Sequence, residues 1–147
     1  MTTRELITLM SDSKNKMLKT EQLEALLKKK LEGKEYISMK SKKNLVDDIV
    51  NECILYEDGI FKFNETEKYV CFTMRTIAEY TNLELSDDIE NDYDMLCEAG
   101  MLNSVIETMH GEYDNVKILL QMKCDYILSA NTIEAQLIET YLLLALK

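Results

Sequence analysis

Residues 54–63 read Ile54-Leu55-Tyr56-Glu57-Asp58-Gly59-Ile60-Phe61-Lys62-Phe63, with Asp-Gly between two runs of β-prone side chains. This arrangement is typical of a two-residue hairpin turn, because glycine tolerates the positive φ that a type I′ turn needs. An isolated hairpin is only marginally stable in water. We therefore expect one small β-hairpin near residues 54–63, which lies on a larger helical body or pairs with another subunit.

Apolar residues on both sides of this stretch recur every three or four positions, the spacing of an amphipathic helix. The chain has no proline and only four glycines, so it has few of the turn-forming residues that many-stranded folds need. These features predict a mainly α protein, an irregular bundle of six to seven helices with one hairpin. The clearest helical repeats fall in residues 20–32, 39–54, 64–81, 87–99 and 112–129.

Length and charge suggest how the chain is organised. A chain of 147 residues is long enough to bury one continuous core. Residues 1–43 carry a net charge of +5, whereas residues 44–147 carry −15. Such an acidic body disfavours duplex nucleic acid as a direct partner, because it would repel the phosphates. We expect a basic N-terminal arm or short helix over residues 1–19 and a single helical domain over residues 20–147.

The C-terminal residues form the most apolar helix that the sequence predicts. Asn131 and Glu134 have capping-box spacing, which indicates that a separate last helix begins there. Its final turns are apolar on nearly every side, and such a helix is either central to a core or covered by another chain. A chain terminus usually lies at the surface, so we expect subunit contacts here. The residues predicted to form interfaces are Ile60, Phe61, Phe63, Ile133, Leu137, Tyr141, Leu142 and Leu144.

Residues that carry catalysis or hold cofactors are scarce. A Ser or Cys nucleophile normally needs a base, and the one histidine, His110, is expected at a helix end where it can interact with the dipole. The glycines are too far apart for a phosphate-binding loop. An EF-hand loop counted from Asp88 would need Gly and Glu where Tyr93 and Ala99 stand. We therefore predict that the protein is not an enzyme and has no catalytic residues, no cofactor and no metal site.

The cysteines indicate a reducing compartment. Cys53, Cys71, Cys97 and Cys124 each lie in an apolar stretch and form no Cys-x-x-Cys pair, so we expect reduced thiols in the core. The N-terminus has no basic and apolar secretory signal, and no apolar run approaches the roughly 20 residues of a membrane helix. We expect a protein of the cytoplasm that makes no membrane contact.

The hairpin and the segment Ile77-Ala78-Glu79-Tyr80-Thr81-Asn82-Leu83-Glu84 resemble parts of small helical virion proteins of tailed bacteriophages. The resemblance covers mainly residues 36–130 and is nearest to the head-to-tail connector or neck adaptor families. It implies an assembly role in a virion ring that contacts portal or tail proteins and is built in the host cytoplasm. The arm, the hairpin and the C-terminal helix would then join neighbouring copies, since ring contacts pair different patches.

Two other functions fit the same sequence. One is a hydrolase with a carboxylate pair, although 27 acidic residues favour no particular pair. The other is an acidic inhibitor that imitates nucleic acid and blocks a host nucleic-acid enzyme. An assembly protein should form a concentration-dependent oligomer, whereas an inhibitor should be a monomer whose binding weakens steeply with salt. The carboxylates of such an inhibitor would be Glu84, Asp87, Asp88, Glu90, Asp92, Asp94 and Glu98.

Overall fold

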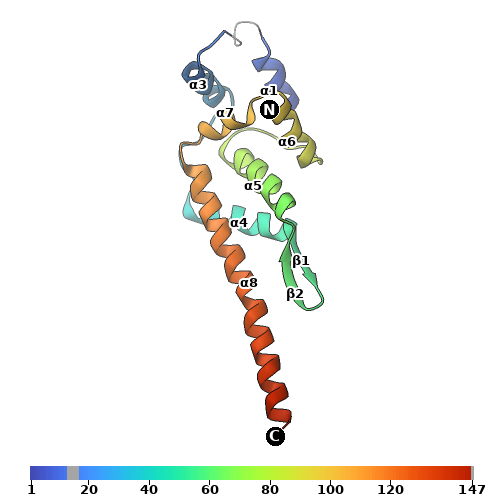
Figure 1. Cartoon of the computed structure of the whole chain (residues 1–147). Coiled ribbons are helices and arrows are strands. Elements are labelled where there is room, and N and C mark those ends of the chain that lie inside the picture. The colour runs from blue at the N-terminus through green and yellow to red at the C-terminus, as the bar shows by residue number, and fades with distance from the viewer. Residues whose placement is uncertain (13–16, 147) are drawn as a thin grey trace.

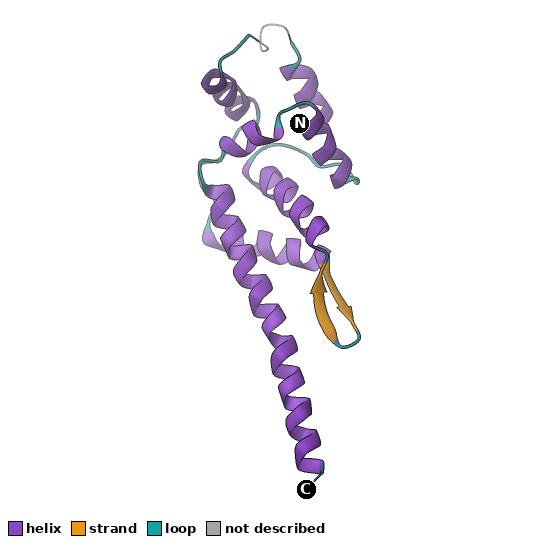
Figure 2. Cartoon of the chain, in the orientation of Figure 1, coloured by secondary structure: helices purple, strands orange, loops and turns teal. Residues whose placement is uncertain are grey.

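The computed structural model describes residues 1–12 and 17–146, apart from the side chains at positions 134 and 135. Residues 13–16 of the expected arm therefore lie outside the described part. The described residues form seven helices and one hairpin (Figures 1 and 2), which confirms the predicted fold class. In chain order the elements are α1 (Thr3–Met10), α3 (Thr20–Lys30), α4 (Met39–Cys53), β1 (Ile54–Glu57), β2 (Ile60–Phe63), α5 (Glu65–Tyr80), α6 (Ile89–Glu98), α7 (Leu102–Glu107) and α8 (Glu112–Ala145).

The hairpin forms where the Asp-Gly turn predicts it. β1 and β2 pair in antiparallel fashion, with Glu57 opposite Ile60 at the turn. Asp58 and Gly59 have φ values of 54° and 76°, as a type I′ turn requires. The next helix, α5, begins directly after β2, and the Oδ1 atom of Asn64 caps it by accepting the Glu67 backbone N–H.

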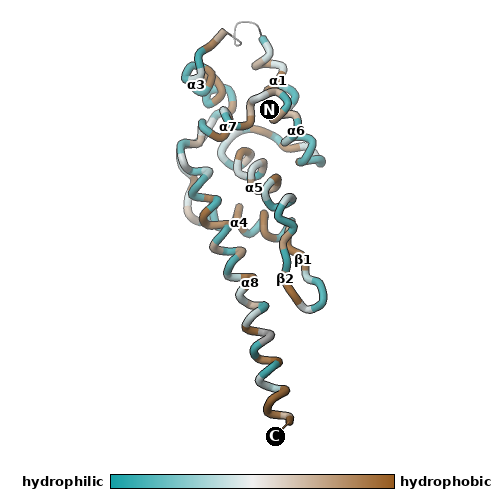
Figure 3. Tube along the Cα trace, in the orientation of Figure 1, coloured by the Kyte–Doolittle hydropathy of each residue, from teal (hydrophilic) through white to brown (hydrophobic). Residues whose placement is uncertain are grey.

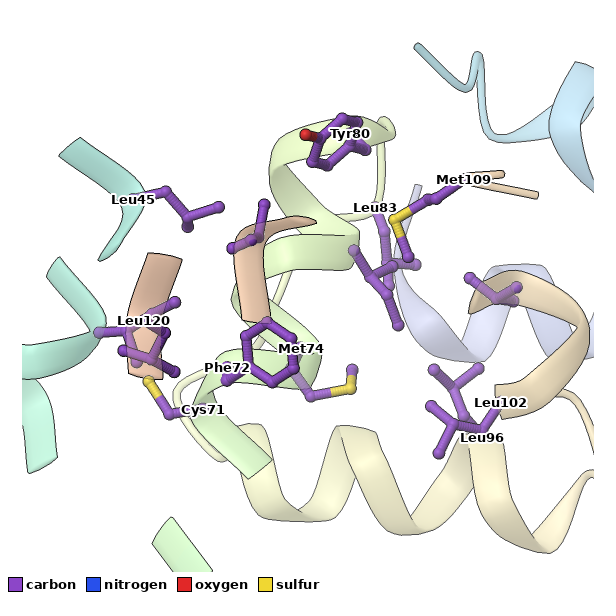
Figure 4. Close-up of a cluster of buried hydrophobic side chains, with 14 of the residues drawn as sticks. Leu45, Cys71, Phe72, Met74, Tyr80, Leu83, Leu96, Leu102, Met109 and Leu120 are labelled. Carbon is purple, nitrogen blue, oxygen red and sulfur yellow. The ribbon is translucent and has the colours of Figure 1, made fainter. Parts of the chain in front are cut away.

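The core lies where helices from distant parts of the sequence meet. α4 packs against α5 and α8, and α5 also packs against α6. Figure 4 shows side chains from these elements, among them Met74 of α5 and Leu96 of α6, which are both fully buried. α1 packs on α6 and contributes the buried Leu6, so this N-terminal helix belongs to the body.

One charged pair is buried inside the body. The Nζ atom of Lys42 in α4 lies 3.0 Å from Oε1 of Glu112 at the start of α8, and the two residues are only 4% and 7% exposed. Glu112 also accepts hydrogen bonds from the Tyr80 hydroxyl and the Asn115 amide. Burial raises the pKa of Glu112, but hydrogen bonds from Asn115, Lys42 and Tyr80 outweigh it, so the pKa lies below its ordinary value. The pair ties the first turns of α4 and α8 together.

The last helix is longer than the sequence predicted. α8 runs unbroken from Glu112 to Ala145, so the expected start of a separate helix at Asn131 was wrong. No glycine or proline interrupts this stretch, and helices end most readily at those residues. The Asn131 side chain has a different partner, the hairpin. The side chain of Glu134, the other half of the expected capping box, lies outside the described part.

Candidate functional site

α8 leaves the body after it passes the hairpin. Its N-terminal half packs on α4, α5 and β2, whereas Figure 1 shows its C-terminal part extending past the hairpin with no other element beside it. We call residues 132–146 the C-terminal tail. Every tail side chain that the structure describes is exposed. The tail is thus an unpartnered helical extension of four turns.

Most tail residues are apolar, and Figure 3 shows the last turns of α8 in brown, the colour of hydrophobic residues. An exposed apolar surface of this extent on a folded protein usually marks an interaction site. All five C-terminal residues that the sequence predicted for interfaces lie on it. The large apolar side chains of the tail, each between 56% and 85% exposed, are Ile133, Leu137, Ile138, Tyr141, Leu142, Leu143, Leu144 and Leu146.

A side-chain amide joins the hairpin to α8 where the tail begins. The Phe61 backbone N–H donates to Oδ1 of Asn131, and Nδ2 of Asn131 donates to the Phe61 carbonyl oxygen, both at 2.8 Å. Phe61 lies opposite Tyr56 in the pair next to the turn pair, where backbone groups point away from the partner strand. The Asn131 amide therefore takes the place that a third strand would occupy beside β2.

The hairpin side chains are less open than those of the tail. The Phe61 ring lies 4.8 Å from the Tyr56 ring and is partly covered. Phe63 is partly buried against the core, with Lys68 Nζ 5.5 Å from its ring. Ile60 remains exposed, as does Tyr56, which the sequence analysis did not select. Of the three predicted hairpin residues, only Ile60 is fully available to a partner.

The outer face of α8 beside the body carries further candidates that the sequence analysis missed. Ile118, Met122 and Tyr126 are 58%, 62% and 74% exposed. The sequence analysis predicted a helix over residues 112–129 but named no interface residue on it. A second apolar repeat at positions 118, 122 and 126 was the signal that could have identified this face.

The acidic residues between positions 84 and 98 do not share one exposed face. Asp92 is buried, and its Oδ2 atom accepts from the backbone N–H and hydroxyl of Ser86 at 2.8 and 2.9 Å. Asp88 caps α6 by accepting the Asn91 backbone N–H. The Glu84 carboxylate lies 3.7 Å from the N-terminal amine. Three of the seven predicted carboxylates thus have partners within the fold. The exposed ones are Glu84, Asp87, Asp88, Glu90, Asp94 and Glu98.

All four cysteines are free thiols, and three of them are buried as expected. Burial raises the pKa of Cys53 to about 11. Burial, together with a hydrogen bond to the Glu52 carboxylate, raises that of Cys71 to about 12. The prediction was wrong for Cys97, which is exposed because α6 turns Leu96 rather than its neighbour toward the core.

The described residues contain no cluster of three or more His, Cys, Asp or Glu side chains placed to hold a metal ion. Within the same part of the chain, no helix combines the length and apolarity needed to cross a membrane. Comparison with protein families, curated proteins and solved structures gave no match for this chain.

Proposed function

We propose that this protein is a non-catalytic structural or assembly protein that acts through protein–protein interfaces, with the C-terminal tail as its main docking element. The observation that carries this proposal is the uncovered apolar surface of the tail. Burying one large apolar side chain stabilises a complex by about 1.5–3 kcal/mol. The tail therefore gains most from contact with another apolar protein surface.

The fold supports a docking role because it holds the tail in one direction before any partner binds. The tail continues α8 without a break, and α8 is tied to the body by the Lys42–Glu112 pair at its start and by Asn131 at the hairpin. A helix that is already ordered loses less conformational entropy on binding than a disordered segment does. The tail can thus bind without a folding step.

The resemblance to head-to-tail connector or neck adaptor proteins supplies the setting that we propose. In that setting, copies of the chain form a ring in a bacteriophage virion, bind portal or tail proteins, and assemble in the host cytoplasm. The tail would reach toward a neighbouring copy or ring. The exposed Ile60 and Tyr56 of the nearby hairpin would widen the contact.

The test is the molar mass of the purified chain, measured by light scattering after size exclusion over a range of concentrations and at two ionic strengths. We expect an oligomer that disappears when residues 133–147 are removed. The helical circular dichroism of the body should persist, because no described tail side chain packs on it. A full chain that stays monomeric throughout would contradict self-assembly.

The acidic inhibitor is the second candidate, favoured by six exposed carboxylates and no basic residue between positions 84 and 98. The burial of Asp92 weakens this candidate, because that carboxylate cannot imitate a phosphate. An inhibitor should be a monomer that binds a basic nucleic-acid enzyme, and its affinity should fall steeply as salt rises. The light-scattering series at two ionic strengths separates the two functions.

A further inference from the structure

α8 carries two apolar stripes on different sides. The inner stripe, with Val116, Leu120 and Cys124, is buried in the body. The outer stripe consists of residues that are all more than half exposed. At about 100° per residue, the two stripes lie about 140° apart around the helix. The outer stripe comprises Ile118, Met122, Tyr126, Ile133, Leu137 and Leu144.

The outer stripe follows an 11-residue repeat. Each position of the stripe recurs 11 residues later: 118 at 129 and 140, 122 at 133 and 144, and 126 at 137. Large apolar side chains occupy all of these positions except 129 and 140, which hold the smaller Ser129 and Thr140. Eleven residues in three turns give about 3.67 residues per turn, close to the 3.6 of a free helix. Two such stripes stay in contact over their whole length with only a slight right-handed twist.

The outer stripe is also longer than the alternative face of the tail. It spans the 27 residues from Ile118 to Leu144, which at 1.5 Å per step is about 39 Å, and its first part lies beside the body. The opposite side of the tail carries Ile138 and Leu142. Toward the N-terminus of α8, the same side of the helix is covered by the body, for example at Cys124. Of the two faces, the outer stripe is therefore the one that forms a continuous exposed apolar surface along α8, and we call this surface the seam.

We propose that the occupant of this seam is α8 of a second copy of the chain, an inference that rests on the proposed assembly function. A partner must present an apolar stripe of the same period and length, and α8 itself is such a surface. A seam about 39 Å long and about 10 Å wide covers about 400 Å² on each copy. Two copies with their flanking side chains thus approach the roughly 1,000 Å² that a specific interface needs.

A recess beside the seam gives the second copy a further place to pack. It lies between α4 and α8 and has a volume of about 330 Å³. Its lining is half apolar and half charged: Val46, Leu119, Met122, Lys43, Asp47 and Lys123. Met122 is shared by the recess and the stripe, so a side chain of the second helix can pack against the mouth of the recess.

The experiment compares two pairs of substitutions by light scattering. Ile133→Gln/Leu137→Gln changes the outer stripe, whereas Ile138→Gln/Leu142→Gln changes the opposite face at nearly equal exposure, 57% and 56% against 56% and 60%. We expect the wild type and the second variant to reach at least twice the 17.1 kDa of one chain. The outer-stripe variant should dissociate at least tenfold more readily.

Cysteine cross-linking gives an independent readout of the seam. Ser129→Cys and Thr140→Cys are made separately in a Cys97→Ser background, which removes the exposed native thiol. Parallel helices in register should cross-link each variant with itself. Antiparallel helices that overlap from Ile118 to Leu144 are centred near residue 131, so Ser129→Cys should then cross-link with itself and Thr140→Cys should not. Failure of every combination would overturn the inference.

The outcomes separate this inference from the proposed function. An oligomer that requires the tail but tolerates the outer-stripe substitutions would overturn pairing through the seam and leave the assembly function standing. If both pairs of substitutions weakened the oligomer equally, pairing through the seam would likewise be overturned and the assembly function would stand. A chain that remains monomeric at all concentrations would contradict the seam and self-assembly, and would favour the acidic inhibitor.

Discussion

The two halves of α8 have similar apolar content but opposite surroundings. In the N-terminal half, Val116, Leu120 and Cys124 are buried against the body. In the tail, Leu137 and Leu142 are more than half exposed, although they continue the same helix. Apolar content alone therefore does not tell which residues are buried in the fold and which stay exposed. The difference comes from α4, α5 and the hairpin, which end where the tail begins.

This comparison predicts that substitutions in the body lower the free energy of unfolding, whereas those in the tail change association. The largest effect should come from Lys42→Met, which leaves the Glu112 carboxylate buried without its cation. Removing one partner of a buried ion pair costs about 3–5 kcal/mol. Denaturant unfolding measures this loss. Lys43→Met, at the exposed neighbour, is the control and should change stability by about 0.5 kcal/mol or less.

Leu96→Ala and Leu137→Ala compare the same change in the core and in the tail. Leu96 is fully buried, so its truncation leaves a cavity and should lower the free energy of unfolding by about 3 kcal/mol. Leu137 is 56% exposed, and its truncation should leave the unfolding of the monomer nearly unchanged. Unfolding at low protein concentration, where copies do not associate, makes the comparison. An equal loss in both variants would mean that the tail packs on the body.

Asn131→Ala tests the junction between the two halves. The substitution removes two hydrogen bonds to Phe61, each worth about 1 kcal/mol, so the hairpin should separate from α8 more often. Amide hydrogen exchange at Phe61 should become faster by tenfold or more, while exchange in α5 stays slow. Asn131→Asp should have a smaller effect, since a carboxylate can still accept the Phe61 N–H but cannot donate to the Phe61 carbonyl oxygen. Unchanged exchange at Phe61 would show that other contacts hold the hairpin.

The smallest effect should be the acid dependence of the body. The pKa of Glu112 is lower in the folded chain than its ordinary 4.5, so the unfolded chain binds the extra proton first as pH falls. The stability that Glu112 contributes is complete above about pH 4.5 and is lost as pH drops through the folded pKa. The free energy of unfolding should thus fall less steeply with acid in Glu112→Gln. Parallel curves for the two proteins would contradict this role.

Local patterns predicted most of the fold. The Asp58-Gly59 turn and the helical repeats depend on near neighbours in sequence, which periodicity and turn chemistry describe well. The tail was also predicted as an exposed apolar helix, because its composition is extreme. These features need no knowledge of contacts between distant segments.

Contacts between distant segments were beyond the sequence. Asn131 looked like a helix cap, but its partner Phe61 lies 70 residues away, and no local rule links the two. The Lys42–Glu112 pair also spans 70 residues. Cys97 and Leu96 both fit a helical stripe, and the way α6 settles on α1 and α5 decided which of them is buried. The apolar repeat of the outer stripe is visible in the sequence of α8, but the sequence does not show which side of the helix the body covers.

The amide of Asn131 also limits how copies of this protein can aggregate. An open strand edge is a template for fibril growth, because its free backbone groups recruit strands from other molecules. Asn131 occupies the outward-facing N–H and C=O of Phe61 on that edge of β2, and each strand is only four residues long. A strand from another copy would have to displace this amide before it could pair along β2. A crowded solution of this chain should stay free of the cross-β order that binds amyloid dyes.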